Sequence, residues 1–253
     1  MRSFTKPFFF YSLIFLLIAG GGLLAQPTVN TPTISAVTTT SATLGGKIAV
    51  GTSITGYGTA YKTTAGVAAT DNPQNGGAVP DGSIPYTFTQ NRIVFTAGTQ
   101  YFWVAWATGT GGTGLSAEQS FFTEPNQPAT FSITAASTTN NQIVLSFPAA
   151  SSLVGAAPAT GGYVLFRHAG SAATVSVTDG SAPPANGTGD KIATITSIAT
   201  SYTDGSLSAQ TQYYYTLVPF VWDGSTATTY NYNTTSPLST NGFTLSNPPS
   251  GQP

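Results

Sequence analysis

The sequence predicts an all-β protein built from two consecutive β-sandwiches. The chain is rich in turn-forming residues, with 28 Gly and 17 Pro, and in the Thr, Tyr and Phe that favour strands. Short apolar or alternating segments recur every 8 to 12 residues or so, which is typical of a sandwich or barrel. No long stretch repeats apolar residues at positions i, i+3, i+4 and i+7, so amphipathic helices are not expected.

The charge and cysteine content narrow the class further. Charged residues make up 6% of the chain, whereas about 25% is usual in globular proteins. Cysteine is absent, so the stability must come from burial rather than from disulfides.

The N-terminal segment has the layout of a secretory signal peptide. Arg2 and Lys6 precede an apolar run from Phe8 to Ile18, and small residues lead to Ala25. An uncleaved membrane anchor is the alternative, although Gly20 to Gly22 interrupt a stretch that is barely long enough to span. Cleavage leaves a net negative chain with no stable membrane span. We therefore expect a secreted or cell-surface protein that binds neither nucleic acid nor an anionic membrane.

The remaining chain divides into two units at a proline-rich linker. Because this linker is short and holds two prolines, we expect it to be stiff and to restrict how the units are oriented. The predicted segments are a signal peptide at 1–25, a first sandwich at 26–124, the linker at 125–128, a second sandwich at 129–247 and a loosely ordered tail at 248–253.

The strands follow from alternation and from the turn residues between them. In the first unit we expect strands at 33–37, 41–50, 54–62, 86–95, 98–108 and 115–123. In the second unit we expect them at 129–135, 142–147, 163–168, 174–178, 191–198, 212–221 and 235–245.

Several of these segments resemble a known family. Residues 40–46, 54–61, 98–101 and 112–123 are similar to a bacterial fibronectin type III domain, and residues 162–171, 200–204, 211–215 and 230–237 resemble a related variant. The resemblance implies an immunoglobulin-like (fibronectin type III-like) sandwich in each unit, of a kind that recurs in secreted and surface proteins of bacteria. It also implies that Tyr101 points inward as a tyrosine corner. It implies little about function, because this fold hosts many unrelated roles.

No catalytic, cofactor-binding or metal-binding residues are predicted. The single histidine, His168, has no G-x-S-x-G motif near it. Four of the six Asp residues precede Gly, as in tight turns, and no zinc or EF-hand spacing is present. A weak calcium site in the loop 179–190 stays open. Asn186 and Asn233 fit the glycosylation pattern, a match that arises easily by chance in a Thr-rich chain. We expect a protein that is not an enzyme and needs no cofactor.

The two aromatic strands at 98–108 and 209–222 are apolar on both faces. The resemblance places Tyr101 inward, and because side chains alternate along a strand, Trp103 then belongs to the core with it and every second residue points outward. The outward set, with the neighbouring third strand of the second unit, forms a candidate interface: Phe102, Val104, Trp106, Val164, Phe166, Tyr214, Val218, Phe220 and Trp222.

Three interpretations of this candidate interface compete. In the first, loops or the other domain cover it. In the second, it packs against other copies of the chain in an extracellular fibre, sheath or surface layer, helped by strand edges. In the third, it binds a surface polysaccharide or another surface protein, with Trp106, Trp222 and Tyr214 as stacking platforms. Because so few charges oppose association, self-assembly is our leading prediction, and an adhesive or carbohydrate-binding module is the alternative.

Overall fold

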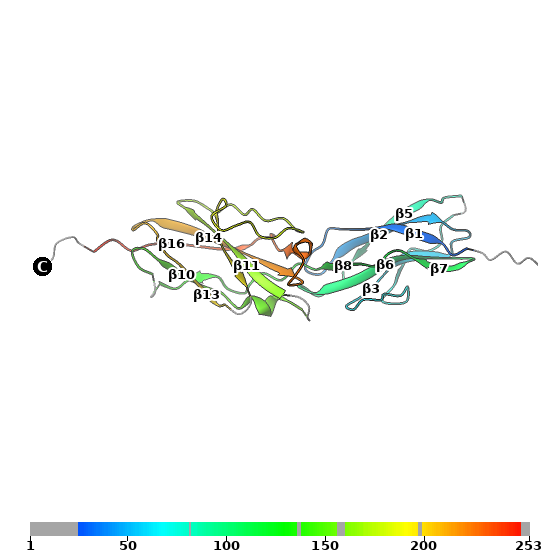
Figure 1. Cartoon of the computed structure of the whole chain (residues 1–253), viewed down its shortest axis with the longest axis horizontal. Helices are drawn as coiled ribbons and strands as arrows, with labels where there is room; N and C mark the ends of the chain where they lie inside the picture. Colours follow the sequence, from blue (N-terminus) through cyan, green and yellow to red (C-terminus); the bar gives the residue numbers. More distant parts are fainter. Residues whose placement is uncertain (1–24, 81, 136–137, 156–159, 197–198, 249–253) are drawn as a thin grey trace, which may run out of the picture.

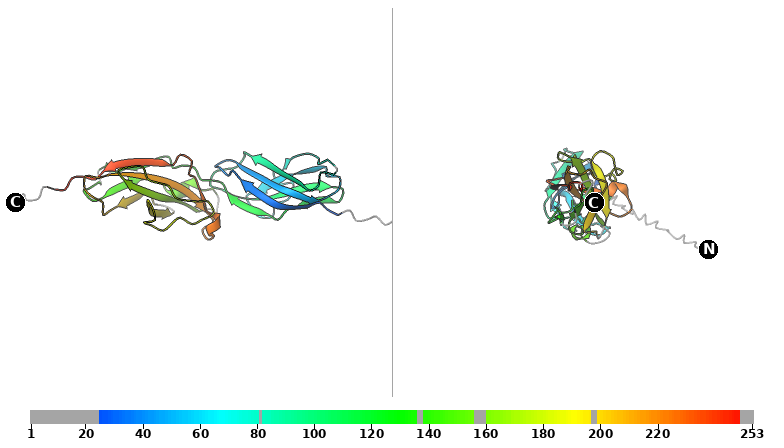
Figure 2. Two further views of the ribbon diagram at one scale, coloured as in Figure 1. Left: turned by 90° about the horizontal axis from the view of Figure 1, so that it is seen from above. Right: turned by 90° about the vertical axis from the view of Figure 1, so that its left-hand side faces the viewer.

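The computed structural model describes residues 25–80, 82–135, 138–155, 160–196 and 199–248. Two β-sandwiches lie end to end along one axis (Figure 1), and the view from above shows the same elongated arrangement (Figure 2). The predicted signal peptide falls almost wholly outside the described residues. Within the described part of the chain, no helix has the length and apolar character needed to cross a membrane.

The first sandwich is formed by β1 to β8. Their bounds are β1 (Thr28–Ser35), β2 (Ala42–Val50), β3 (Gly56–Lys62), β4 (Gln74–Asn75), β5 (Tyr86–Arg92), β6 (Gln100–Gly109), β7 (Gly112–Leu115) and β8 (Gln119–Phe122). One sheet has the order β1-β2-β5, and the other has the order β4-β3-β6-β7, with β8 also paired to β6. The hairpin between β6 and β7 closes at Gly112, whose φ of 105° requires glycine.

The second sandwich repeats this order with β9 to β16. Their bounds are β9 (Ser132–Ile133), β10 (Ile143–Ser146), β11 (Thr160–Ala169), β12 (Lys191–Thr196), β13 (Ser201–Asp204), β14 (Gln212–Trp222), β15 (Asn231–Tyr232) and β16 (Leu238–Phe243), with short 3₁₀ helices η2 (Ala150–Leu153) and η3 (Ala227–Thr229). Its sheets run β9-β10-β13 and β12-β11-β14-β15, with β16 also paired to β14. All strand pairs in both domains are antiparallel.

Each core lies between its two sheets and contains the inward half of the aromatic strand. Trp103 is fully buried in the first core, and Tyr215 is fully buried in the second. The predicted tyrosine corner is present, since the Tyr101 hydroxyl accepts a hydrogen bond from Thr96 N at 2.9 Å. Tyr213 repeats it with Ser208 N at 3.0 Å. These bonds fix the start of β6 and of β14 against the preceding loop.

One predicted strand is wrong. Residues 174–178 alternate as a strand would, but they form no ladder with any described strand. Instead Val175 and Val177 pack against the outer side of the β11–β14 sheet. Alternation is the same for a segment that lies on a sheet as for one that extends it, so the pattern could not separate the two.

Candidate functional site at the domain junction

The outward side chains of the first domain are covered by the loop at 63–73. Val104 is 2% exposed and Trp106 is 8% exposed, and both pack with Val67 and Ala69 of that loop. Glu118 holds the loop in place, because its Oε2 accepts hydrogen bonds from Gly66 N at 2.8 Å and from Val67 N at 2.7 Å. The first domain therefore has a small second core on the outside of its larger sheet.

The second domain covers the same face with the segment 173–178 and with Tyr230 and Tyr232. Phe166 and Phe220 are fully buried there, in a cluster with Tyr232. Asp190 anchors the segment by accepting a hydrogen bond from Thr174 N at 2.6 Å, and the Tyr232 hydroxyl donates to Ser181 O at 2.8 Å.

The candidate interface predicted from the sequence is therefore not an exposed surface. Its residues do point out of the sandwiches as expected, but Val104, Trp106, Val164, Phe166, Val218 and Phe220 are buried, and Phe102, Tyr214 and Trp222 are half-buried. Trp222 is stacked on Tyr230, with ring centroids 4.5 Å apart. The interpretation that loops cover these faces is the correct one, and assembly through the faces loses its basis.

Removing the Glu118 carboxylate is expected to open this cover locally. Glu118→Ala deletes the acceptor of two backbone N–H groups, which at an exposed carboxylate is worth about 1 kcal/mol. Hydrogen exchange at Gly66 and Val67 should accelerate roughly fivefold. Glu118→Gln keeps an acceptor and serves as the control; equal exchange in all three proteins would contradict the assignment.

The groups searched for chemistry have structural partners. Ser171 Oγ lies 2.9 Å from Nδ1 of the exposed His168, within a turn, and no described carboxylate bonds to that ring. Asp179 and Asp190, at the ends of the loop considered for calcium, each accept a backbone N–H. The described residues contain no group of three or more His, Asp or Glu placed to hold a metal ion. Asn233, one of the two asparagines that fit the glycosylation pattern, is buried, with 5% of its surface exposed.

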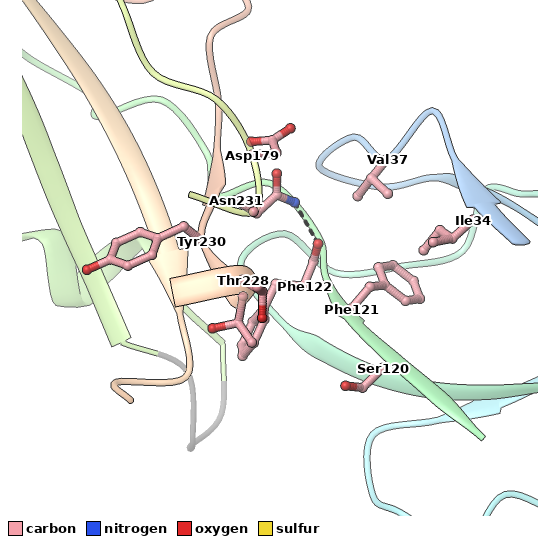
Figure 3. A pocket seen from close by; sticks show the side chains of 11 residues that line it. Ile34, Val37, Ser120, Phe121, Phe122, Asp179, Thr228, Tyr230 and Asn231 are labelled. Carbon is pink, nitrogen blue, oxygen red and sulfur yellow. Dashed lines mark hydrogen bonds between the residues drawn. The ribbon is translucent and has the colours of Figure 1, made fainter. Parts of the chain in front are cut away.

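The two domains meet at a junction sealed by side-chain amides. Asn231 Nδ2 donates to Phe122 O at 2.6 Å, a bond drawn in Figure 3. Asn233 Nδ2 donates to Pro125 O at 2.8 Å, and Gln127 Nε2 returns a bond to Asn233 O at 2.9 Å. Asn231 and Asn233 are both buried. The carbonyl of Phe122 at the end of β8 and that of Pro125 in the linker thus accept hydrogen bonds from the second domain.

A backbone contact closes the other side of the junction. Gly155 N, just after η2, donates to Gly98 O at 2.7 Å. A Cβ added at Gly98 would lie 2.3 Å from Leu153 O, and one added at Gly155 would lie 2.2 Å from Thr99 Oγ1. Only residues without a side chain allow the domains to approach this closely.

Two cavities lie along the junction and share Val37. The first, of about 270 Å³, has Ile34, Val37 and Phe121 of the first domain opposite Asp179 and Thr228 of the second (Figure 3). The second, of about 330 Å³, is lined by residues of both domains: Val37, Thr38, Thr39, Glu124, Asn233 and Thr235. Together they form a groove between the domains, which we call the junction groove.

Among the carboxyl groups that the structure describes, the one with the largest pKa shift lies in the junction groove. Glu124 is half-buried at the end of the first domain, and burial followed by the negative charge of Asp179 raises its pKa to about 7. No described residue donates a hydrogen bond to this carboxylate, and no Lys, Arg or His lines either cavity. The sequence assigns Glu124 no role beyond its place as the last residue of the first predicted sandwich, because nothing in a linear sequence brings Asp179 beside it.

Among known proteins, similarity to this chain is found in solved structures. No family model and no curated protein matches the chain. A two-domain fibronectin type III segment of chicken tenascin is similar over 87% of this chain and 100% of that one, with 15% identity and a TM-score of 0.41. The FN1–FN3 domains of chicken CNTN1 cover 88% of this chain and 69% of that one, with 13% identity and a TM-score of 0.35.

A third structure matches part of the chain. The sensor domain of the anti-sigma factor RsgI4 of Pseudobacteroides cellulosolvens covers 40% of this chain and 96% of that one, with 14% identity and a TM-score of 0.31. The predicted resemblance to tandem fibronectin type III domains is confirmed for the fold, because both domains pair a three-stranded sheet with a five-stranded sheet and have the tyrosine corner. A bacterial origin and secretion stay predictions.

Proposed function

We propose that the chain is an extracellular structural or adhesion module, a stiff two-domain rod that holds its two poles apart and carries out no catalysis. The observation that supports this most is the sealed junction, in which buried Asn231 and Asn233 bond to the carbonyls of Phe122 and Pro125 and Gly155 contacts Gly98. A flexible tether between two independent domains would leave those carbonyls to water.

The course of the chain suits the same role. Pro27 packs on Gly114 at the end of the first domain far from the junction, and Asn247 bonds to Asn140 at the far end of the second domain. The described chain therefore enters at one pole of the rod and leaves at the other.

Small-angle scattering with light scattering tests the proposal. At pH 5, a monomeric, elongated particle whose profile fits the two-domain structure would support a stiff rod, whereas a profile that needs many relative orientations would contradict it. Concentration-dependent growth into filaments would instead revive self-assembly, which would then have to use strand edges, because the sheet faces are covered.

One observation favours a second candidate function, binding of a neutral saccharide. A cavity of about 400 Å³ is lined by the remaining exposed edge of Trp106 together with Thr70, Asn75, Thr108 and Thr113. An aromatic surface beside hydroxyl and amide groups suits a sugar. Titration with oligosaccharides should shift the Trp106 indole N–H signal and not that of fully buried Trp103; an unchanged Trp106 signal would reject this candidate.

A further inference from the structure

The junction groove is lined by two carboxyl groups from different domains, Glu124 and Asp179, and by no described Lys, Arg or His. Glu124 follows β8 and the last core residue of the first domain, and its backbone is tied to that domain, since Glu124 N donates to Thr38 O at 3.2 Å and Gly98 N donates to Glu124 O at 3.0 Å. Asp179 belongs to the second domain, where its Oδ1 accepts a hydrogen bond from Tyr232 N at 2.8 Å.

The surroundings of Glu124 offer nothing to balance a negative charge. From the first domain the groove presents Val37, Thr38 and Thr39, and from the second it presents Asn233 and Thr235. The titratable groups on the adjoining cavity are Asp179 and Tyr230. The basic residues of the second domain are used elsewhere: Arg167 pairs with Asp204 at 2.8 Å, and Lys191 bonds to Asn186 at 2.7 Å.

We propose that the junction is a pH-responsive hinge, in which a proton on Glu124 favours close contact between the domains and loss of that proton loosens it. The neutral contacts of Asn231, Asn233 and Gly155 hold the domains together, and the charge of Glu124 opposes them. Separation of the domains would hydrate Glu124 and move it away from Asp179.

The direction follows from the pKa of Glu124. It is about 7 in the closed junction against an ordinary value of 4.5, so the closed state binds the proton more tightly. Close contact is therefore favoured fully below about pH 4.5 and weakens as the pH rises towards about 7. Over this window the ratio of closed to open junction should fall by less than about tenfold per pH unit, because half-burial leaves the carboxyl partly screened by water.

A spin-label distance measurement tests the hinge. The chain has no cysteine, so Thr87→Cys on β5 and Thr194→Cys on β12 place one label on each domain at exposed strand positions. The distance distribution of the two-domain protein is expected to be narrow at pH 5 and to broaden by pH 8.5. Glu124→Gln should keep it narrow at both values. Asp179→Asn, which can still accept from Tyr232 N, removes one of the two causes that raise the pKa of Glu124, so the distribution should broaden less than in the wild type.

Asp190→Asn, which changes a carboxyl remote from the groove, is the matched control and should broaden as the wild type does. An unchanged wild-type distribution between pH 5 and 8.5, or a Glu124→Gln protein that broadens like the wild type, would overturn the hinge. The inference rests on the proposed stiff rod, and the two fail differently. A broad distribution at every pH rejects the rod, whereas a narrow one at every pH rejects only the hinge.

Discussion

Phe220→Lys is expected to unfold the second domain. The Phe220 side chain is fully buried, and its ring lies over Gly162 of β11, where an added Cβ would come within 2.1 Å of it. It also packs on Tyr230 and Tyr232, with centroids 5.1 and 5.8 Å away. Truncating a buried Phe costs about 3–5 kcal/mol, and an unpaired ammonium adds a desolvation penalty. Since domains are stable by about 5–15 kcal/mol, little or no stability should remain.

Circular dichroism and thermal scanning measure this result. Phe243→Lys is the matched control, because Phe243 is 60% exposed on the same sheet and the substitution should change stability by less than about 0.5 kcal/mol. A Phe220→Lys protein that folds normally would show that the segment 173–178 does not cover the face in solution, and would restore the candidate interface as an exposed surface.

Replacing both junction asparagines is expected to uncouple the domains without unfolding either. Asn231→Ala with Asn233→Ala leaves the carbonyls of Phe122 and Pro125 without their donors. A buried carbonyl that loses its partner costs about 1–3 kcal/mol, and the two losses need not add because the sites adjoin. The energy is lost between the domains, so each sandwich should keep its own core.

The measurement is the distance distribution between labels at positions 87 and 194, together with a thermal scan. We expect a broad distribution at every pH and two separate unfolding transitions. Asn241→Ala removes an exposed amide of β16 that bonds to Gln212 at 3.0 Å, and it should leave the distribution narrow. A double variant with wild-type distances would mean that Gly98 and Gly155 suffice to hold the junction.

The sequence predicts the sandwiches well because their signals are local. The resemblance of the Gly-Thr-Gln-Tyr run at 98–101 to a fibronectin type III domain implied the tyrosine corner and an inward Tyr101, and alternation then assigned Trp103 to the same core. These features depend on neighbours two to five residues away. The same periodicity predicted correctly that Trp106 and Phe220 point out of the sandwich.

What covers those side chains could not be predicted, because the covering contacts are long-range. The carboxyl of Glu118 bonds to Gly66 and Val67, which lie about fifty residues earlier. The junction groove joins Glu124 to Asp179 and Asn231 to Phe122 across similar or greater separations. The low charge content favoured self-assembly as a prediction, yet Glu118, Asp179 and Asp190 use their carboxylates to hold loops of the chain itself.

The contact between Gly98 and Gly155 makes each domain depend on the residue that the other presents at the junction. Proteins built from tandem domains can exchange those domains when each domain tolerates any neighbour. Here a domain joined to an unrelated neighbour would keep this junction only if glycine stood on both sides of it and amide donors faced the carbonyls of Phe122 and Pro125. Recombination should therefore move the two domains together. A chimera joined at residues 125–128 should lose the fixed orientation of its domains even if both halves fold.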